Sequence, residues 1–465
     1  MKGSSPVSNT RQRVVTVLAA CCAVAAIVVP ATEAAAHSGH SGRSKRATLA
    51  AFNDAATTPP MGIDDWYQDG CNVTQQDIVD NAKELISSGL AADGYDYVIL
   101  DDCWMAGHRT KKGALRPRPS AFPAGIAWLA KRVHGLGLKL GIYESAGTRT
   151  CHGYPGSYGH YAQDARTFAR WGVNYVKLDL CSMPKGADRP ELFDEFGADL
   201  RSDNPDIVYS QELPVGEAGR PTSANFMRLV ALSSQNANLW RVTPDENPKV
   251  PASTTIDGAL DADLPLSGYA GSGHWNDLDF LMTGNTVFKW TSAEQESQLS
   301  IWAEMSSPLI VSANLTSTTA VAHLASRITA TTSGSLLANK AMIAVDQDPV
   351  QGHQAGRYGL MKVVVKSMAD GGYAVLVANT APSARTITVP LSVMGIPAGA
   401  TWKAVWSSQH FVASSSVTWT LHGYSTVLYE VTPAASSSSS ASPSPTSTVS
   451  STPTPTPTPS ASQTS

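Results

Sequence analysis

The sequence predicts a (β/α)8 barrel followed by an antiparallel β-sandwich. Between Pro59 and Leu315, eight short runs rich in β-branched and aromatic residues alternate with segments that have helical spacing. Eight such units over roughly 260 residues match the size of this barrel. From about Asp348 to Val431 the pattern changes to short Val-, Thr- and aromatic-rich runs broken by Gly, Pro and Ser. That pattern is typical of a β-sandwich.

Composition and charge limit the class of protein. The chain has 465 residues with 42% hydrophobic content, enough for two domains with sizeable cores. A net charge of -4 with 15% charged residues offers no basic surface for nucleic acid. The single basic cluster, at 109–119, is interrupted by Gly and Pro and predicts a solvated loop. We therefore expect no nucleic-acid partner.

The N-terminus has the pattern of a secretory signal. Three basic residues precede an apolar run over 14–29, and Ala34–Ala36 offers an A-x-A cleavage site. This predicts a signal peptide at 1–36, an N-terminal segment at 37–57 and a secreted protein. Leu18–Cys21 also resembles a lipobox, which would make a lipoprotein. No other stretch reaches the roughly 18 apolar residues of a membrane span.

The remaining boundaries follow from composition. We expect the barrel at 58–345 and the sandwich at 346–432. Residues 433–465 are almost entirely Ser, Thr, Pro and Ala, which predicts an extended linker or tail that buries no core. What this tail attaches to cannot be read from the sequence. The sandwich is expected to pack against the barrel, with sugar binding as the alternative.

Four cysteines remain after the signal region, namely Cys71, Cys103, Cys151 and Cys181. An exported protein would oxidise them, and four cysteines allow three connectivities. Sequential pairing closes two loops of about 30 residues, each worth roughly 3–4 kcal/mol in the chain-entropy model. A metal site is the competing interpretation, but no CxxC or HxxxH spacing is present, so we expect no metal.

The eight β-rich runs share one layout, apolar at the start and polar or aromatic at the end. In such a barrel the carboxyl ends of the strands build the active site, so their side chains should ring one pocket. The runs are PPMGIDDW, YDYVILDDCW, KLGIYESAG, YVKLDLC, DIVYSQEL, LWRVTPD, HWNDLDFL and PLIVSANL. Their ends supply Trp66, Asp101, Asp102, Tyr143, Asp179, Glu212, Arg241, Asp245, Asp277 and Asp279.

The fourth run carries a charged pair inside an apparently buried strand. Because side chains alternate along a strand, Lys177, Asp179 and Cys181 point to one face. A buried ion pair rarely gains net stability, which favours a functional role. A ring of carboxylates with one Lys, one Arg and aromatics suits either a hard metal ion or a sugar. The Trp and Tyr positions favour the sugar.

Several of these segments resemble glycoside hydrolase family 27, the α-galactosidases. The resemblance covers about 59–429 and rests on GIDDWY with GCN, DDCWM, the block ending LGLKLGIY, TCHGYPGSYGHY, YVKLDLC, HWNDLDFL and AVDQDP. It implies that Asp179 is the nucleophile and Asp245 the general acid/base of a retaining exo-glycosidase that acts by double displacement on α-galactosides. It implies no cofactor.

The resemblance also implies the binding residues and the disulfides. Asp101 and Asp102 match the pair that holds the 4- and 6-hydroxyls of galactose, and Trp66 matches the aromatic on the apolar sugar face. Tyr143, Lys177, Glu212, Arg241 and Asp279 match the remaining sugar contacts. The family pairing is Cys71 with Cys103 and Cys151 with Cys181. We further expect Lys177 to lower the pKa of Asp179, and burial beside that carboxylate to raise the pKa of Asp245.

Two departures from the family pattern leave the aglycone preference open. Ile63-Asp64-Asp65-Trp66 stands where Trp-Asn-Ser-Trp is expected, which predicts two additional acids at the pocket rim. Glu144-Ser145 stands where Ala-Asp is more usual. A purely structural role is the favoured reading of Asp277. His152, His160 and His274 receive no role.

Several functions remain open on the sequence alone. Within the family, β-L-arabinopyranosidase, α-N-acetylgalactosaminidase and isomalto-dextranase are alternatives. Outside enzymes, a non-catalytic galactoside-binding protein on a Ser/Thr/Pro stalk is the alternative. The family resemblance implies that Glu212 and Val215 of the stretch SQELPV lie beside the 2-position of the sugar, where members that accept a 2-acetamido group have small residues. We therefore expect rejection of a 2-acetamido group. The oligomeric state cannot be read from the sequence.

Overall fold

A computed structural model describes residues 52–218, 223–313, 336–350, 353–358 and 360–434. The predicted signal peptide and nearly all of the predicted tail lie outside these residues. None of the described helices is long and apolar enough to cross a membrane.

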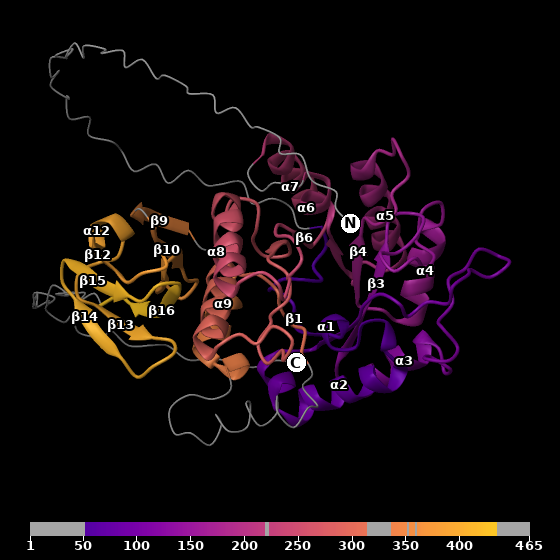
Figure 1. The fold of residues 1–465 in the computed structure, drawn as a ribbon, viewed down its shortest axis with the longest axis horizontal. Helices are drawn as coiled ribbons and strands as arrows, with labels where there is room; N and C mark the ends of the chain where they lie inside the picture. The colour runs from indigo at the N-terminus through magenta and orange to yellow at the C-terminus, as the bar shows by residue number, and fades with distance from the viewer. Residues whose placement is uncertain (1–51, 219–222, 314–335, 351–352, 359, 435–465) are drawn as a thin grey trace, which may run out of the picture. The chain divides into compact units, whose positions relative to one another are not determined.

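Eight parallel strands form one curled sheet in the order β7-β6-β5-β4-β3-β2-β1-β8 (Figure 1). Beyond β7, Leu281 bridges in parallel to Val311 of β8 and so links the two ends of the sheet. Each of the eight predicted runs contains one strand, and the predicted barrel class is confirmed. The strands are β1 (Met61–Asp64), β2 (Tyr97–Leu100), β3 (Lys139–Ser145), β4 (Tyr175–Asp179), β5 (Val208–Gln211), β6 (Leu239–Arg241), β7 (Trp275–Asp277) and β8 (Leu309–Val311).

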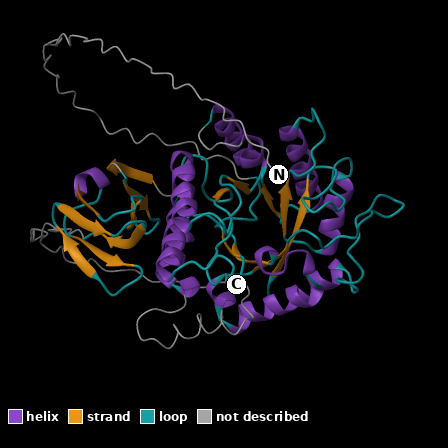
Figure 2. Cartoon of the chain, viewed as in Figure 1, coloured by secondary structure: helices purple, strands orange, loops and turns teal. Residues whose placement is uncertain are grey.

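Helices connect successive strands (Figure 2). In α2, Thr74 and Asp77 form a reciprocal capping box, and Gly89, just beyond the helix, takes a left-handed conformation at φ 83°. The helices are α1 (Trp66–Asp69), α2 (Gln75–Ser87), α3 (Ile126–His134), α4 (Tyr161–Trp171), α5 (Arg189–Asp203), α6 (Leu213–Ala218), α7 (Ala224–Asn236), α8 (Ala252–Asp263), α9 (Ser292–Met305) and α11 (Lys340–Asp346). Short 3-10 turns are η1 (Gly70–Asn72), η2 (Leu90–Asp93), η3 (Leu264–Leu266) and η4 (Leu336–Ala338).

Alternation along the strands separates two apolar layers. Val176 and Leu178 of β4 belong to the main core, whereas Tyr175 belongs to a second cluster with residues of five other strands, including Leu239 and Trp275. Residues two positions apart share a face, so Lys177 and Asp179 follow Tyr175 on its side of the sheet. The charged residues therefore lie above a buried apolar floor.

The C-terminal domain is an antiparallel β-sandwich, as predicted. Its larger sheet has the order β14-β13-β16-β11-β10-β9, and β12 pairs with β15 in a second sheet. Trp402 and Trp419 lie in the core between them. The elements are β9 (His353–Tyr358), β10 (Met361–Ser367), β11 (Tyr373–Asn379), β12 (Arg385–Pro390), α12 (Leu391–Met394), β13 (Ala400–Ala404), β14 (His410–Ala413), β15 (Ser416–Leu421) and β16 (Ser425–Thr432).

Direct hydrogen bonds join the sandwich to the barrel. Trp406 Nε1 donates to Ser300 Oγ of α9 at 2.7 Å, and buried Lys366 of β10 donates to Ser306 Oγ at 2.5 Å and to the carbonyl of Val345 at 2.6 Å. Burial lowers the pKa of Lys366, and the nearby carboxyl groups only partly offset this. Packing against the barrel is thus one role of the sandwich.

Two disulfides tie together the loops that follow the first four strands. Cys71 pairs with Cys103 and Cys151 with Cys181, which confirms the predicted connectivity. Cys71 and Cys103 follow β1 and β2, and Cys151 and Cys181 follow β3 and β4. Both bonds therefore brace the end of the sheet where a site is expected.

Candidate active site

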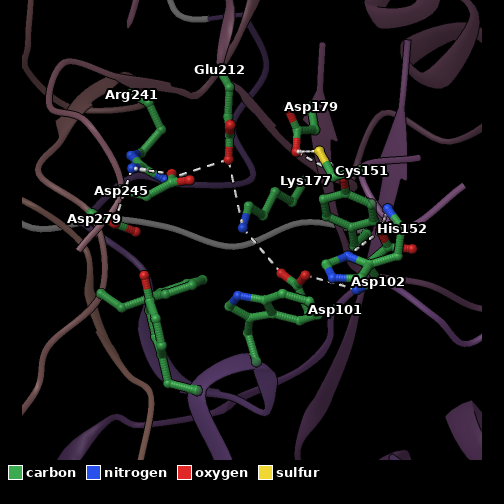
Figure 3. A pocket seen from close by; sticks show the side chains of 14 residues that line it. Asp101, Asp102, Cys151, His152, Lys177, Asp179, Glu212, Arg241, Asp245 and Asp279 are labelled. Atoms are coloured by element: carbon green, nitrogen blue, oxygen red, sulfur yellow. Dashed lines mark hydrogen bonds and ion pairs between the residues drawn. The ribbon is translucent and has the colours of Figure 1, made fainter. Parts of the chain in front are cut away.

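A pocket of about 160 Å³ lies at the carboxyl ends of the strands (Figure 3). All ten side chains predicted for catalysis or sugar binding line it, together with Cys151, predicted only as a disulfide partner, and three residues that were not predicted. The lining comprises Trp66, Tyr67, Asp101, Asp102, Tyr143, Cys151, His152, Lys177, Asp179, Glu212, Arg241, Asp245, Asp279 and Phe280. Their individual roles remain predictions.

Of the four additional residues, Tyr67 lies in the short helix α1 and the other three lie in loops, so strand alternation says nothing about the direction of these side chains. Tyr67, His152 and Phe280 each directly follow Trp66, Cys151 or Asp279 in the chain. Tyr67 Oη donates a short hydrogen bond to the carbonyl of Glu246. An aromatic residue beside a predicted site residue was the signal that could have indicated them.

Asp179 ends β4 and is held from several directions. Tyr143 Oη donates to its Oδ2 at 2.7 Å, and the backbone N–H of Leu180 donates to Oδ1 at 2.6 Å. Cys151 Sγ lies 2.9 Å from Oδ2, but a disulfide sulfur has no proton to donate. Burial raises the pKa of Asp179, and the Tyr143 hydrogen bond and Lys177 only partly offset this. The expected net lowering of this pKa was wrong, because burial outweighs the lysine charge.

Lys177 is paired mainly with residues other than Asp179. Its Nζ lies 3.0 Å from Asp101 Oδ2 and 3.6 Å from Glu212 Oε1, and 4.6 Å from the ring centre of Phe280. Burial alone would lower the pKa of Lys177, but the charges of Asp101 and Glu212 outweigh it and raise that pKa well above its usual value. Lys177 therefore stays charged.

Arg241 is the second buried cation of the pocket. Its Nη2 lies 3.0 Å from Asp245 Oδ1 and 2.9 Å from Asp279 Oδ2, and its Nη1 lies 3.3 Å from Glu212 Oε1. The Asp245 side chain is 78% exposed. The positive charge of Arg241 lowers the pKa of Asp245, and the partial loss of hydration beside the pocket wall opposes this less strongly. The expected raised pKa of Asp245 was wrong for this structure, because the ion pair favours the carboxylate.

Asp101 and Asp102 lie side by side after β2. The backbone N–H of Asp102 donates to Asp101 Oδ1 at 2.7 Å. Asp102 itself accepts from the backbone N–H groups of Cys103 at 2.6 Å and His152 at 3.1 Å. Burial raises the pKa of Asp102, and these hydrogen bonds oppose the change. Both carboxyl groups are thus fixed by the backbone around them.

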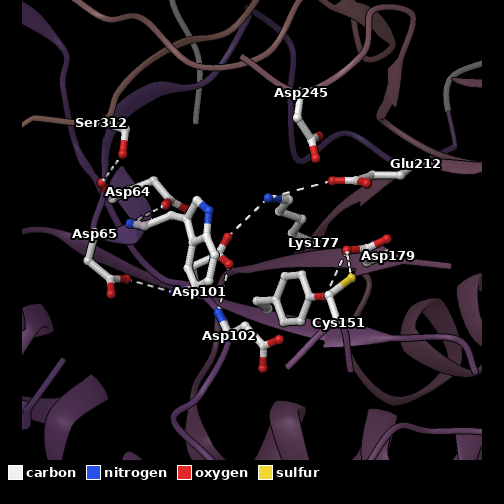
Figure 4. Close-up of polar contacts among 12 residues, drawn as sticks. Asp64, Asp65, Asp101, Asp102, Cys151, Lys177, Asp179, Glu212, Asp245 and Ser312 are labelled. Atoms are coloured by element: carbon white, nitrogen blue, oxygen red, sulfur yellow. Dashed lines mark hydrogen bonds and ion pairs between the residues drawn. The ribbon is translucent and has the colours of Figure 1, made fainter. Parts of the chain in front are cut away.

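Asp64 and Asp65 lie beneath the pocket and not at its rim, so that expectation was wrong. Both are fully buried, and burial raises the pKa of each well above its usual value. Asp64 Oδ1 accepts from the backbone N–H of Trp66 at 2.9 Å, and Asp65 Oδ1 accepts from that of Asp101 at 2.7 Å (Figure 4). They support two residues of the pocket without lining it.

The end of β7 carries one carboxylate outside the pocket, Asp277, and is followed by one inside it, Asp279. Asp277 Oδ1 accepts from the backbone N–H of Asp279 at 2.8 Å, and Asp277 does not line the pocket, as expected of a structural residue. Asp279 has a φ of 77°, which is uncommon for a residue with a side chain. Burial raises the pKa of Asp279 to about 6, against the opposing charge of Arg241. Glu144 is fully buried and also lies outside the pocket lining.

Neither group of metal-type ligand atoms among the described residues suits a metal ion. One consists of Cys71, Cys103 and His152, and the other of Cys151, Asp179 and Cys181. All four cysteines are disulfide-bonded, and metal binding requires thiolates.

Two family models match the chain. The model for α-galactosidase A matches residues 58–348, and the model for the α-galactosidase C-terminal β-sandwich domain matches 358–431. The chain belongs to the α-galactosidases of glycoside hydrolase family 27. It is therefore a glycoside hydrolase of the melibiase type.

Individual relatives of this family 27 chain cover most of its length. It is 34% identical to α-galactosidase from Cyamopsis tetragonoloba over 82% of this chain and 88% of that protein. It is 35% identical to α-galactosidase A from Cellvibrio japonicus over 73% and 80%, respectively. Among solved structures, α-galactosidase I from Mortierella vinacea matches with a TM-score of 0.71 and 28% identity, covering 82% of this chain and 99% of that one.

Asp65 provides a test of the support beneath the pocket of this glycoside hydrolase. We expect Asp65→Ala to lower kcat/KM about tenfold, because the buried N–H of Asp101 loses its acceptor and an unsatisfied buried donor costs about 1–3 kcal/mol. Asp65→Asn should stay within about threefold of wild type, because the amide oxygen keeps an acceptor and a neutral side chain resembles a protonated carboxyl group. Steady-state kinetics on an aryl glycoside measures kcat/KM for both variants. Equal losses in the two variants would contradict the role of Asp65 as the acceptor for the Asp101 N–H.

Proposed function

We propose that this chain is a retaining exo-α-galactosidase that releases terminal α-galactosyl groups by double displacement. The observation that carries the proposal is that Asp179 and Asp245 line one small pocket together with all the predicted sugar-binding side chains. Membership of the α-galactosidase family supports the sugar assignment. The volume of about 160 Å³ lies below the roughly 300–1,000 Å³ of larger ligand sites, which supports binding of one terminal sugar.

In the first step, Asp179 attacks the anomeric carbon as a carboxylate. The bond to the leaving oxygen breaks as Asp245 gives that oxygen its proton, and a galactosyl ester of Asp179 forms. In the second step, Asp245 takes a proton from water while the water oxygen attacks the same carbon. Galactose leaves with a second inversion, and Asp179 returns as a carboxylate.

The charges of the pocket suit these steps to different degrees. Arg241 favours Asp245 as a carboxylate, which is the form needed as base in the second step. The first step needs Asp179 as the carboxylate and the proton on Asp245, whereas burial raises the pKa of Asp179 and Arg241 lowers that of Asp245. The arrangement needed for the first step is therefore the one that these shifts disfavour.

We also propose that the protein is secreted. Two disulfides brace the pocket, and such bonds persist in oxidising compartments. The signal-like N-terminus agrees with this. Detection of the mature chain in culture medium, with its N-terminus near His37, is the direct measurement.

Substrate preference is the first test of the proposed activity. We expect 4-nitrophenyl α-galactoside to be cleaved with a kcat/KM at least about 100-fold above the α-N-acetylgalactosaminide, because Glu212 would clash with the acetamide and lose a hydroxyl partner. The β-L-arabinopyranoside should be cleaved more weakly, because it lacks the 6-hydroxyl. A higher kcat/KM on the arabinopyranoside would assign the chain to that activity. Galactose binding without hydrolysis of any of the three would favour the binding-protein alternative.

The two acids should differ in their dependence on the leaving group. Asp179→Ala is expected to abolish turnover of every substrate. Asp245→Ala should reduce hydrolysis of raffinose by about 100-fold or more and affect an aryl galactoside less, because an activated aryl oxygen departs without a proton. Rates on the two substrates measure this. Near wild-type activity in Asp179→Ala would exclude it as the nucleophile.

The pH profile tests the order of the pKa values of Asp179 and Asp245. Since the pKa of Asp245 is lowered and that of Asp179 raised, the acid limb of kcat/KM reflects Asp245 and the alkaline limb reflects Asp179. In Asp245→Asn, assayed on an aryl galactoside, only the ionisation of Asp179 remains. The alkaline limb should disappear and the acid limb should move to higher pH. A shift of the acid limb to lower pH would show that the pKa of Asp179 lies below that of Asp245.

A further inference from the structure

His152 lines the pocket, and the two chemical steps make no use of it. It lies beside Asp102 in the close-up of the pocket (Figure 3). Its side chain is 43% exposed, whereas that of Asp102 is only 2% exposed. His152 is therefore more accessible to a ligand than the carboxyl group next to it.

The imidazole ring is held by groups on several sides. The Trp66 ring packs edge-on against it, with centroids 4.8 Å apart. The backbone N–H of His152 donates to Asp102 Oδ2 at 3.1 Å, and Nδ1 lies 3.4 Å from the same oxygen. A ring nitrogen lies within 4.8 Å of both sulfurs of the disulfide between Cys71 and Cys103. The preceding residue belongs to the other disulfide. His152 is thus fixed in place at the pocket wall.

This placement leaves one ring nitrogen for a ligand. A carboxylate oxygen accepts hydrogen bonds, so Asp102 favours the tautomer of His152 with its proton on Nδ1. In that tautomer Nε2 carries no proton and can accept a hydrogen bond. Among the described residues, no group hydrogen-bonds to Nε2. A fixed, half-exposed acceptor in a sugar-sized pocket suits a ligand hydroxyl.

We propose that His152 is a specificity-determining residue that accepts a hydrogen bond from the 6-hydroxyl of the galactosyl group. The inference rests on the proposed function and on the expectation from the family resemblance that Asp101 and Asp102 hold the 4- and 6-hydroxyls and that Trp66 covers the apolar sugar face. His152 contacts both Trp66 and Asp102, so a sugar that touches these two residues passes the edge of the imidazole. The exocyclic hydroxyl is the substituent that can extend toward that edge.

The competing role for His152 is to pack against the ring of Trp66 and keep that ring in position. Two variants separate the roles. His152→Phe retains an aromatic ring against Trp66 but has no acceptor, and His152→Ala removes both. His108→Ala is a matched control, because His108 is exposed and does not line the pocket.

The experiment compares 4-nitrophenyl α-galactoside with its 6-deoxy analogue, which lacks only the 6-hydroxyl. In the wild type the galactoside should have the higher kcat/KM. In His152→Phe and in His152→Ala, the ratio between the two substrates should fall about tenfold, as expected for one lost hydrogen bond. The fall should come from a higher KM for the galactoside, because the contact is made in the ground state and in the transition state alike. His108→Ala should keep the wild-type ratio.

The outcomes separate this inference from the proposed function. If the wild type cleaves the galactoside and His152→Phe keeps the wild-type ratio, the hydroxyl contact is overturned and packing alone remains. An unchanged ratio in both His152 variants overturns it as well. If the wild type cleaves neither substrate, the proposed function fails, and the inference fails with it. The contact is supported if the ratio of kcat/KM for the galactoside to that for the 6-deoxy analogue falls in both variants while kcat on the 6-deoxy substrate is retained.

Discussion

The pocket depends on one carboxylate, Glu212, that is shared by two buried cations. Glu212 Oε1 lies 3.6 Å from Lys177 Nζ and 3.3 Å from Arg241 Nη1. Lys177 continues the network to Asp101, and Arg241 continues it to the two aspartates at 245 and 279. Removing an ion from water costs several kcal/mol even after relaxation. Each charge in the network therefore constrains the position of the next. Asp101, Asp245 and Asp279 keep fixed positions for this reason.

The parallel register of the sheet makes this network possible. Tyr143 lies opposite Lys177 in the pairing of β3 with β4, and Arg241 lies opposite Asp277 in the pairing of β6 with β7. Side chains from neighbouring strands thus leave the sheet at matching heights. The apolar floor that includes Tyr175 and Trp275 lies on the same face of the sheet. Low polarity beneath the charges strengthens their attraction and raises the penalty for leaving any of them unpaired.

The two acids proposed for catalysis, Asp179 and Asp245, have opposite pKa shifts because their surroundings differ. Asp179 is buried, and the hydrogen bond from Tyr143 does not overcome the cost of burying its charge. Asp245 extends into solvent but contacts the guanidinium of Arg241 directly. The order of the two pKa values therefore depends on burial and on individual distances. Sequence spacing alone contains neither quantity, and for this reason the expectation based on Lys177 was wrong.

The sequence by itself determined the eight strands, the sandwich and the set of polar strand ends, because strand alternation and barrel topology bring such ends to one place. It also indicated the family, and with it the disulfide pairing that the structure confirms. Only the tertiary structure placed Asp64 and Asp65 beneath the pocket, since β1 ends at Asp64 and the sequence does not show where along the strand the pocket begins. It alone brought His152 against Trp66 and Asp102, residues far from it in the chain. The directions of loop side chains depend on the disulfides, backbone hydrogen bonds and neighbouring rings that hold each loop, and those contacts exist only in the folded chain.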